Sequence, residues 1–335
     1  MSVAGKTAIV LFNLGGPDSP EAVAPFLRNL FSDPAIITLP WFLRLPLAWT
    51  IARGRAPVAR DIYAKIGGAS PIVRETQVQA RALEAALAQG GIAAKAFIAM
   101  RYWHPFSDGA ARAVKAYNPD KIVLLPLYPQ FSTTTTASSL KDWKRAARKA
   151  GLDTPAAEIH CYPEEPGFIT AAAAKIRAAL QDAPAGPGWR LLLSAHGLPQ
   201  RIIDRGDPYQ RQVEQTAAAI VRELAMPELD AIVCYQSRVG RLKWIEPATD
   251  AEIRRAGRDG KRVIVAPIAF VSEHSETLVE LDIEYRHLAA QSGVPDYRRA
   301  ATVGDDAAFI AGLAGLVKQA LAGETAVCGA PEGGP

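Results

Sequence analysis

The sequence predicts an α/β protein made of two successive halves, each with a parallel sheet covered by helices. Apolar runs of strand length alternate with helix-length amphipathic segments along nearly the whole chain. The apolar runs are continuous, which is typical of strands that are buried on both faces. The alternation starts again after a boundary within residues 140–160, and 335 residues suffice for two domains of ordinary size.

The elements of the first half follow from this pattern. Three apolar runs are predicted strands: Thr7–Leu14, Ala93–Met100 and Lys121–Leu127. Amphipathic segments between and after them predict helices: Val73–Gln89, Asp108–Tyr117 and a basic helix that ends near Lys149. Glycine turns at Gly15-Gly16 and Gly67-Gly68 let the backbone approach a ligand closely.

The second half repeats the plan. Its predicted strands are Glu158–Tyr162, Trp189–Ser194, Ala231–Tyr235, Arg262–Phe270 and a segment around Tyr297–Val303. Its predicted helices are Gly167–Leu180, Pro208–Ala225, Ala248–Gly257 and Ala307–Leu321. We therefore expect a first domain over 1–150 that is joined by the C-terminal helix 306–322. A second domain is expected over 151–305, and a flexible tail rich in Gly and Pro over 323–335.

An apolar segment interrupts the first half at residues 36–51. It contains Trp41, Phe42 and Trp49 with Arg44 as the one charged residue, and Pro40 and Pro46 break it. It is too short to span a bilayer. It is either a core segment or an exposed apolar lip that contacts a membrane or a hydrophobic ligand.

Composition excludes several classes of protein. A net charge of +4 is too small to indicate nucleic-acid binding. The three cysteines, Cys161, Cys234 and Cys328, form no CxxC pair, so neither a zinc site nor a cysteine-ligated cluster is indicated. Sparse cysteines and the absence of a signal-peptide pattern favour a cytoplasmic protein.

The segment Val263–Tyr285 changes from an apolar strand into an acidic stretch. Four glutamates spaced 3, 4 and 4 residues apart follow the strand: Glu273, Glu276, Glu280 and Glu284. On a helix this spacing places all four carboxylates on one face, with His274 at its start. The stripe is either a solvated face or a path for metal ions or protons at the carboxyl end of a strand.

A histidine follows another buried strand of the same half. His196 lies in the turn Ser194-Ala195-His196-Gly197, and the carboxyl ends of parallel strands meet at one edge of a sheet. This would place an imidazole across a cleft from a carboxylate. In the first half, Arg101-Tyr102-Trp103-His104 offers a cation and rings for a flat anionic ligand, or an ordinary core. Neither a GxSxG elbow nor an HExxH motif is present.

Taken together, several long segments resemble those of bacterial ferrochelatases that use protoporphyrin. They are Asn13–Pro17, Ile66–Pro71, Arg101–Phe106, Leu127–Ser139, Leu192–Pro199, Gly206–Tyr209, Cys234–Asp250 and Phe270–Tyr285. The resemblance covers nearly the whole chain, and the motifs follow one another in the order of the family. It implies two Rossmann-like domains, each with a four-stranded parallel sheet, and insertion of Fe²⁺ into protoporphyrin IX with release of two protons.

The resemblance also assigns residues. It implies that His196 and Glu276 are the catalytic pair and contact the metal, with an ion path over Glu273, His274, Glu280 and Glu284. Positions that match the porphyrin site are Arg55, Tyr63, Ser70, Arg101, Tyr102 and Trp244. Fe²⁺ is then a substrate, and no tightly bound cofactor is expected. Which residue delivers iron and which accepts protons stays open.

The chain departs from animal members of the family, which hold an iron–sulfur cluster with cysteines. Its tail offers Cys328 alone, so we expect no cluster, and we expect a monomer because the dimerisation extension is missing. The apolar lip suggests peripheral contact with the inner membrane through Trp41, Phe42 and Trp49. Two other functions stay open: a chelatase for cobalt or nickel, and a porphyrin carrier without turnover. A nucleotide-binding enzyme is disfavoured because no GxGxxG follows a strand.

Overall fold

The computed structural model describes residues 5–182, 188–238, 240 and 242–324. Of these, residues 5–161 and 313–324 form one compact unit, and residues 162–312 form another. The expected flexible tail over 323–335 lies almost entirely outside the described residues, as does Cys328. None of the described helices is long and apolar enough to cross a membrane.

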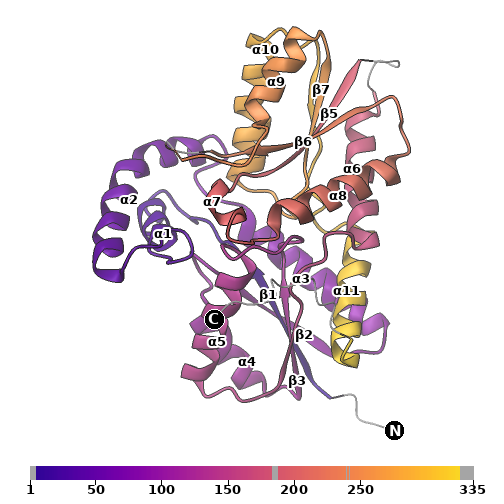
Figure 1. Cartoon of the computed structure of the whole chain (residues 1–335). Helices are drawn as coiled ribbons and strands as arrows, with labels where there is room; N and C mark the ends of the chain where they lie inside the picture. The colour runs from indigo at the N-terminus through magenta and orange to yellow at the C-terminus, as the bar shows by residue number, and fades with distance from the viewer. Residues whose placement is uncertain (1–4, 183–187, 239, 241, 325–335) are drawn as a thin grey trace. The chain divides into compact units, whose positions relative to one another are not determined.

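Each unit contains a four-stranded sheet in which all pairs of neighbouring strands are parallel (Figure 1). The strand orders are β2-β1-β3-β4 and β6-β5-β7-β8, so both sheets have the same topology. The strands of the first are β1 Thr7–Asn13, β2 Ala94–Met100, β3 Lys121–Pro126 and β4 Ala156–Glu158. Those of the second are β5 Trp189–His196, β6 Asp230–Gln236, β7 Arg262–Pro267 and β8 Tyr297–Arg299. The predicted α/β class with two parallel four-stranded sheets is confirmed.

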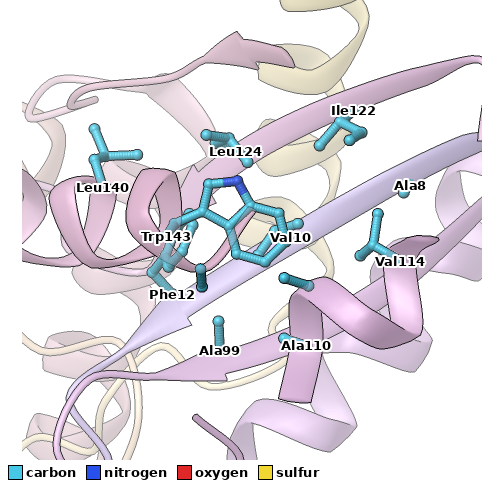
Figure 2. Packing of buried hydrophobic residues seen from close by; sticks show 12 residues of the cluster. Ala8, Val10, Phe12, Ala99, Ala110, Val114, Ile122, Leu124, Leu140 and Trp143 are labelled. Atoms are coloured by element: carbon cyan, nitrogen blue, oxygen red, sulfur yellow. The ribbon is translucent and has the colours of Figure 1, made fainter. Parts of the chain in front are cut away.

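Helices cover the first sheet, as its continuous apolar strands require. The helices of this unit are α1 Val23–Phe31, α2 Trp41–Ala64, α3 Ile72–Gln89, α4 Ser107–Tyr117, α5 Thr136–Ala150 and the second part of α11 Ala307–Ala322. Of these, α3, α4 and α5 contact the strands, whereas α1 and α2 pack against each other. In Figure 2, Val10 and Phe12 of β1 pack beneath Trp143 of α5. The Phe12 and Trp143 rings meet edge to face, with 6.0 Å between their centroids. This core fixes the strand whose end carries the Gly15-Gly16 turn.

The second sheet is covered in the same way. Its helices are α6 Pro166–Leu180, α7 Gln200–Ile203, α8 Tyr209–Leu224, α9 Thr249–Arg258, the π-helix η1 Glu276–Glu284 and α10 Tyr285–Gln291. Leu192 of β5, Val263 of β7, Ile253 of α9 and Leu281 of η1 share one buried cluster. Because β5 and β7 are neighbours in parallel register, both strands end at the same edge.

The apolar segment differs from the broken form that its prolines predict. The helix α2 runs without a break through Pro46 and Pro57. Each proline removes a helical hydrogen bond at a cost of about 3 kcal/mol. Ala48, Ala52 and Ala56 recur every four residues and are buried, and Ala52 and Ala56 share a cluster with apolar side chains of α1. The close approach that these small side chains allow offsets the lost hydrogen bonds.

The acidic segment also differs from the expected α-helix. Residues 276–284 form a π-helix, in which the N–H of Tyr285 bonds to the carbonyl of Glu280, five residues earlier. Glu273 lies in the turn before this helix. The four glutamates therefore do not line one α-helical face, and each has different surroundings.

Candidate active site

The carboxyl ends of β5, β6 and β7 place several polar side chains at one edge of the second sheet. His196 is the last residue of β5 and pairs with Gln236 at the end of β6. The neighbouring strand β7 ends at Pro267, which pairs with Ser194. The chain then passes through Phe270 to the start of η1. Open parallel sheets bind their ligands at this edge.

The geometry of His196 leaves one ring nitrogen available. Its Nδ1 lies 2.7 Å from the carbonyl oxygen of Gly197, and a carbonyl can only accept a hydrogen bond. Nδ1 therefore carries the proton in the neutral ring, and Nε2 has a free lone pair. The Tyr209 hydroxyl donates to the carbonyl oxygen of His196 over 3.1 Å and holds the backbone at this point.

Phe270, His274 and Glu276 form the other part of the site. The centroid of the Phe270 ring lies 6.4 Å from that of His196 and 4.4 Å from that of His274. Nε2 of His274 is 3.7 Å from Oε2 of Glu276. An apolar ring thus lies beside two imidazoles, and a carboxylate follows directly.

The pKa shifts of this pair favour a neutral imidazole beside an ionised carboxylate. Burial lowers the pKa of His274, and the nearby carboxylates of Glu276 and Glu273 reduce this effect without reversing it. Burial would raise the pKa of Glu276, although 30% of its side-chain surface is accessible. Positive charge on His274 when its ring is protonated, the hydrogen bond from Ser275 and the more distant His196 hold that pKa below its ordinary value.

Glu280 is held by the end of β6. Its carboxylate accepts hydrogen bonds from the N–H and the hydroxyl of Ser237, the amide of Gln236 and the hydroxyl of Tyr285. Ser237 has a φ of 62°, a left-handed conformation that is unfavourable for serine. The Gln236 amide also reaches the carbonyl oxygen of Glu276, at 3.4 Å. These bonds fix the first turn of η1 against the strand next to His196.

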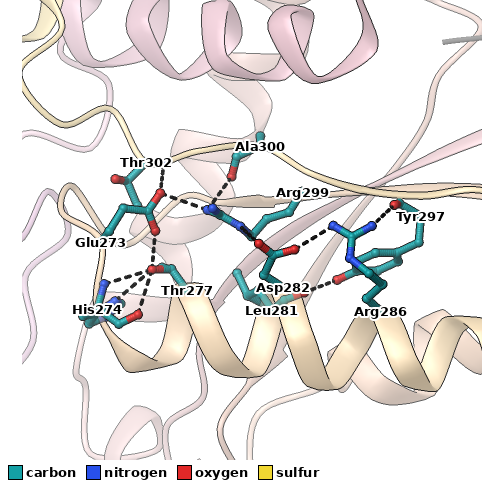
Figure 3. A network of polar contacts seen from close by, with 10 residues as sticks. All are labelled: Glu273, His274, Thr277, Leu281, Asp282, Arg286, Tyr297, Arg299, Ala300 and Thr302. Atoms are coloured by element: carbon teal, nitrogen blue, oxygen red, sulfur yellow. Dashed lines mark hydrogen bonds and ion pairs between the residues drawn. The ribbon is translucent and has the colours of Figure 1, made fainter. Parts of the chain in front are cut away.

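Glu273 has a different set of partners (Figure 3). One carboxylate oxygen accepts from Arg299 Nη1 at 2.9 Å and from the N–H of Thr302 at 3.0 Å. The other accepts from the hydroxyl of Thr277 at 2.5 Å. Burial would raise the pKa of Glu273, but Arg299 and these hydrogen bonds hold it below its ordinary value. Both Glu273 and Glu280 are thus occupied by protein donors.

The remaining members of the predicted ion path are spread out. Glu284, at the end of η1, is exposed. Among the described residues, no group of three or more His, Cys, Asp or Glu side chains is arranged to hold a metal ion. The structure therefore brings together His196, His274 and Glu276, with Phe270 between the imidazoles.

Trp244 lies close to this edge. Its backbone bridges to Pro199, and a Cβ atom on Gly197 would be 3.3 Å from its ring. The same Cβ would be 2.9 Å from the carbonyl oxygen of Gln236, so only glycine fits directly after His196. The sequence motif at residues 194–199 is explained by this close approach.

In the first unit, Arg101 and Tyr102 share a buried partner that the sequence did not single out. The carboxylate of Asp33 accepts from Arg101 Nη2 at 2.7 Å, the Tyr102 hydroxyl at 2.9 Å and the Ser138 hydroxyl at 2.5 Å. Tyr102 is 0% exposed, so its ring offers no surface to a ligand in this conformation. Burial and the Asp33 carboxylate raise its pKa. Tyr102 thus supports the loop that carries Arg101.

The other first-unit residues matched to the porphyrin site lie on α2 and the second glycine turn. Arg55 is exposed, and its guanidinium lies 5.7 Å from the centroid of the Phe31 ring. Tyr63 is buried in the cluster between α1 and α2. The N–H of Ser70 donates to the carbonyl oxygen of Pro17 and joins the two glycine turns. A Cβ on Gly16 would be 2.5 Å from the Ser70 side chain, which explains the glycine.

Sequence reasoning missed Asp33, Gln236, Phe270 and Thr277 as parts of these arrangements. Gln236 directly precedes Ser237 at the end of an apolar strand, a position that could have pointed to it. Phe270 closes the apolar run before Glu273 in the same way. Asp33 and Thr277 give no such signal, because their partners are far away in sequence or lie within an irregular turn.

Comparison with known proteins identifies the family. A sequence profile named Ferrochelatase matches residues 6–321. The chain belongs to the ferrochelatase family. The ferrochelatase of Caulobacter vibrioides is 56% identical over 318 residues, which cover 94% of this chain and 90% of the relative. The ferrochelatase of Phenylobacterium zucineum is 56% identical over 319 residues, or 94% of this chain and 92% of the relative.

A solved structure supports the fold. The sirohydrochlorin chelatase SirB from Bacillus subtilis subspecies spizizenii, in complex with cobalt, has a TM-score of 0.53 at 13% identity. The similarity covers 94% of this ferrochelatase-family chain and 95% of SirB, so the chelatase fold extends over both units. In the part of the chain that the structure describes, Cys234 is a buried free thiol. Burial raises the pKa of Cys234 to about 12, which makes it a poor metal ligand.

Proposed function

We propose that this chain is a ferrochelatase that inserts Fe²⁺ into protoporphyrin IX and releases protohaem and two protons, the final step of haem biosynthesis. Family membership over residues 6–321 supports the reaction class. The observation that carries the site assignment is the convergence at one sheet edge. There the bare Nε2 of His196, the Phe270 ring and the ionised carboxylate of Glu276 come together.

The reaction needs a proton acceptor and a group that replaces iron-bound water. Two pyrrole N–H bonds must lose their protons as the metal enters the macrocycle. Nε2 of His196 has a free lone pair and is our choice for the base. Carboxylate oxygen is a ligand that Fe²⁺ accepts in place of water, and Glu276 supplies it with 30% of its side chain accessible. Glu276 and His274 then receive the ion on its way to the porphyrin.

We propose that porphyrin binding involves Arg55, Tyr63, Ser70, Arg101 and Trp244. The guanidinium of Arg101 would pair with a propionate, since its Asp33 salt bridge leaves 20% of the side chain accessible. Arg55 is exposed and is suited to the second carboxylate. Tyr102 contributes through Arg101 and Asp33. Preference for protoporphyrin over coproporphyrin is tested by comparing kcat/KM for the two.

The contacts of the acidic residues refine the proposed path. Glu273 and Glu280 are engaged by protein donors, so we assign them to holding the site in place. Glu284 is exposed on the same helix, and it is the residue we assign to ion entry. Replacing Glu284 with Gln should then raise KM for Fe²⁺ while leaving kcat within about twofold, because entry precedes the chemical step. An unchanged KM would rule out this role.

Anaerobic insertion of Fe²⁺ into protoporphyrin by wild type, His196→Ala and Glu276→Ala tests the proposal. Loss of a general base or a positioned ligand costs about 10²- to 10⁴-fold in rate, so both variants should be nearly inactive. His287→Ala and Glu228→Gln, at exposed positions of the same unit, are the matched controls. Normal turnover by His196→Ala would make the site assignment wrong.

We further propose that the protein is cytoplasmic and contacts the inner membrane through the apolar lip. Trp41, Phe42 and Trp49 of α2 are 68%, 57% and 53% exposed. Arg53, Arg55 and Arg60 follow on the same helix, as anionic headgroups require. Trp41→Glu with Phe42→Glu should reduce co-sedimentation with anionic vesicles, whereas Val221→Glu on α8 should not. Equal binding by all three proteins would contradict the proposal.

We also propose that the protein is a monomer without an iron–sulfur cluster. Sedimentation velocity tests whether the protein is a monomer, and a dimer would make that part of the proposal wrong. The absorption spectrum and the iron and sulfide content of the aerobically purified protein test whether a cluster is present.

A further inference from the structure

Several hydrogen bonds of the network in Figure 3 meet at the hydroxyl group of Thr277. Thr277 lies in the first turn of η1 and is fully buried. Its Oγ1 is 2.5 Å from Oε2 of Glu273, 3.0 Å from the backbone nitrogen of His274 and 3.3 Å from Nδ1 of His274. The carbonyl oxygen of His274 lies 3.1 Å away.

These distances determine the direction of each hydrogen bond. A hydroxyl group has one proton and two lone pairs. Two oxygen atoms 2.5 Å apart repel unless a proton lies between them, so the Thr277 proton is on the line to Glu273. The neutral carbonyl of His274 is farther away and a weaker acceptor. The two lone pairs of Oγ1 then accept from the backbone N–H and from Nδ1 of His274, which means that Nδ1 carries a proton.

Glu273 cannot easily turn away from Thr277. Its other carboxylate oxygen accepts from Arg299 and from the N–H of Thr302. Arg299 is itself 3.5 Å from the carboxylate of Asp282 and 3.3 Å from the carbonyl oxygen of Ala300. This series of hydrogen bonds, from Arg299 of β8 through Glu273 to Thr277, therefore directs the Thr277 hydroxyl proton to Oε2 of Glu273.

The far side of the His274 ring faces the site. A neutral imidazole carries one ring proton, so Nε2 has a free lone pair when Nδ1 is protonated. Nε2 lies 3.7 Å from Oε2 of Glu276. In the opposite tautomer, an Nε2–H group would face this carboxylate across 3.7 Å and attract its negative charge.

We propose that Thr277 is a positioning residue that keeps the single ring proton of His274 on Nδ1. The carboxylate of Glu276 then faces a ring lone pair and not an N–H group across 3.7 Å, and it stays available to the substrate cation or to a substrate proton. Glu273 and Arg299 act through Thr277. This inference rests on the proposed role of Glu276, but the tautomer itself does not depend on that role.

Nuclear magnetic resonance of protein labelled with ¹⁵N-histidine tests the tautomer directly. The chain has five histidines, and the signal lost in His274→Gln identifies the ring. At mildly alkaline pH, wild type and Thr277→Ser should show Nδ1–H, and Thr277→Val should shift the ring towards Nε2–H. An Nε2–H ring in the wild type, or a tautomer unchanged in Thr277→Val, would overturn the inference.

Kinetics provide a second readout. Thr277→Val should lower kcat for Fe²⁺ insertion by about 10- to 100-fold, as is usual when an outer hydrogen bond to a metal-site residue is lost. KM for protoporphyrin should change by less than about twofold, because Thr277 is fully buried and offers no surface to a ligand. Thr277→Ser keeps the hydroxyl group, so its kcat should be close to that of wild type. Equal loss in the Val and Ser variants would indicate a packing effect and overturn the proposal.

Two controls separate orientation from stability. Thr216→Val removes another fully buried hydroxyl of the same unit, which bonds backbone carbonyls of Pro163 and Gln212, and should leave kcat unchanged. If Thr277→Val does not fold, Thr277→Ala replaces it, because alanine also removes the hydroxyl that accepts from Nδ1. An Nδ1–H ring in Thr277→Ala would overturn the inference, whereas active His196→Ala and Glu276→Ala would overturn the proposed function.

Discussion

Asp33 shows how one buried carboxylate can organise residues that are far apart in the sequence. It binds Arg101, Tyr102 and Ser138, which come from a different turn and from α5. A buried carboxylate is stable only with such partners, and its partners need it equally. Arg101 is therefore held in place by a carboxylate from a distant part of the sequence.

Replacing Asp33 with Ala should destabilise the protein by about 3 to 5 kcal/mol, because a partly buried cation and two buried hydroxyl groups lose their acceptor. KM for protoporphyrin should also rise, since Arg101 is no longer oriented. Urea unfolding and steady-state kinetics measure the two effects. Asp18→Ala, at an exposed position, should change the free energy of unfolding by less than about 0.5 kcal/mol. A Asp33→Ala protein as stable as the control would contradict the assignment.

Glu273 should make stability depend on pH. Its pKa in the folded protein lies below the ordinary value of 4.5, so folding favours the ionised form. The contribution of Glu273 to the free energy of unfolding is complete above pH 4.5. It is lost as the pH falls through the pKa of Glu273 in the folded protein, which is lower than 4.5. The free energy of unfolding of wild type should exceed that of Glu273→Gln by about 2 to 3 kcal/mol near neutral pH, which lies within the usual range for hydrogen bonds to a charged group. Urea unfolding from neutral to acidic pH should show this difference shrinking, and a constant difference would be inconsistent with the ion pair.

At the scale of the element, the π-helix η1 is defined by what its glutamates bind. The wider turn places the Glu276 carbonyl and the Glu280 carboxylate within reach of the same Gln236 amide. Glu280 also holds Ser237 in its left-handed conformation. A π-helix has less favourable backbone packing than an α-helix and persists where such contacts support it. The helix is thus shaped by the strand end beside His196.

Glu280→Ala should destabilise the protein by about 2 to 4 kcal/mol, because several partly buried donors lose their acceptor. Glu284→Ala, four residues later on the same helix, should change the free energy of unfolding by less than about 0.5 kcal/mol, since its side chain is exposed. Equilibrium unfolding in urea compares the two. Similar effects of both substitutions would mean that the Glu280 contacts contribute little.

At the scale of the whole molecule, α11 belongs to both compact units. Its residues up to 312 are part of the second unit, and those from 313 belong to the first. Phe309 is fully buried, with ring centroids 5.9 Å from Phe168 and 6.5 Å from Tyr162. The final helix therefore contributes to two hydrophobic cores.

Phe309→Ala should lower the free energy of unfolding by about 3 to 5 kcal/mol, the cost of a large cavity in a core. Gln319→Ala, at an exposed position of the same helix, should be close to neutral. Thermal and urea unfolding measure both. A small effect of Phe309→Ala would show that the first part of α11 is not an essential part of the second core.

The sequence predicted the sheets well because continuous apolar runs leave few alternatives to buried parallel strands. The placement of His196 and Glu276 after neighbouring strands of one sheet was also predictable, whereas their joint catalytic role stays a prediction. The course of α2 was not, because prolines argue against a helix and its alanine contacts with α1 are tertiary. The π-helix and the roles of Asp33 and Thr277 could not be predicted from the sequence for the same reason. They depend on contacts such as Gln236 with Glu280 that no local pattern encodes.

Because the two sheets have the same strand order, Asn13 and His196 occupy equivalent positions. Each is the last residue of the second strand in its sheet, β1 or β5. The side chain of Asn13 hydrogen-bonds within the protein: it donates to Thr76 and accepts from the N–H of Leu14. The side chain of His196 uses Nδ1 in this way and leaves Nε2 available. The same strand position thus holds a side chain that hydrogen-bonds within the protein in one sheet, and an imidazole with a free lone pair in the other. The difference lies in the side chains at this position and not in the topology, which both sheets share.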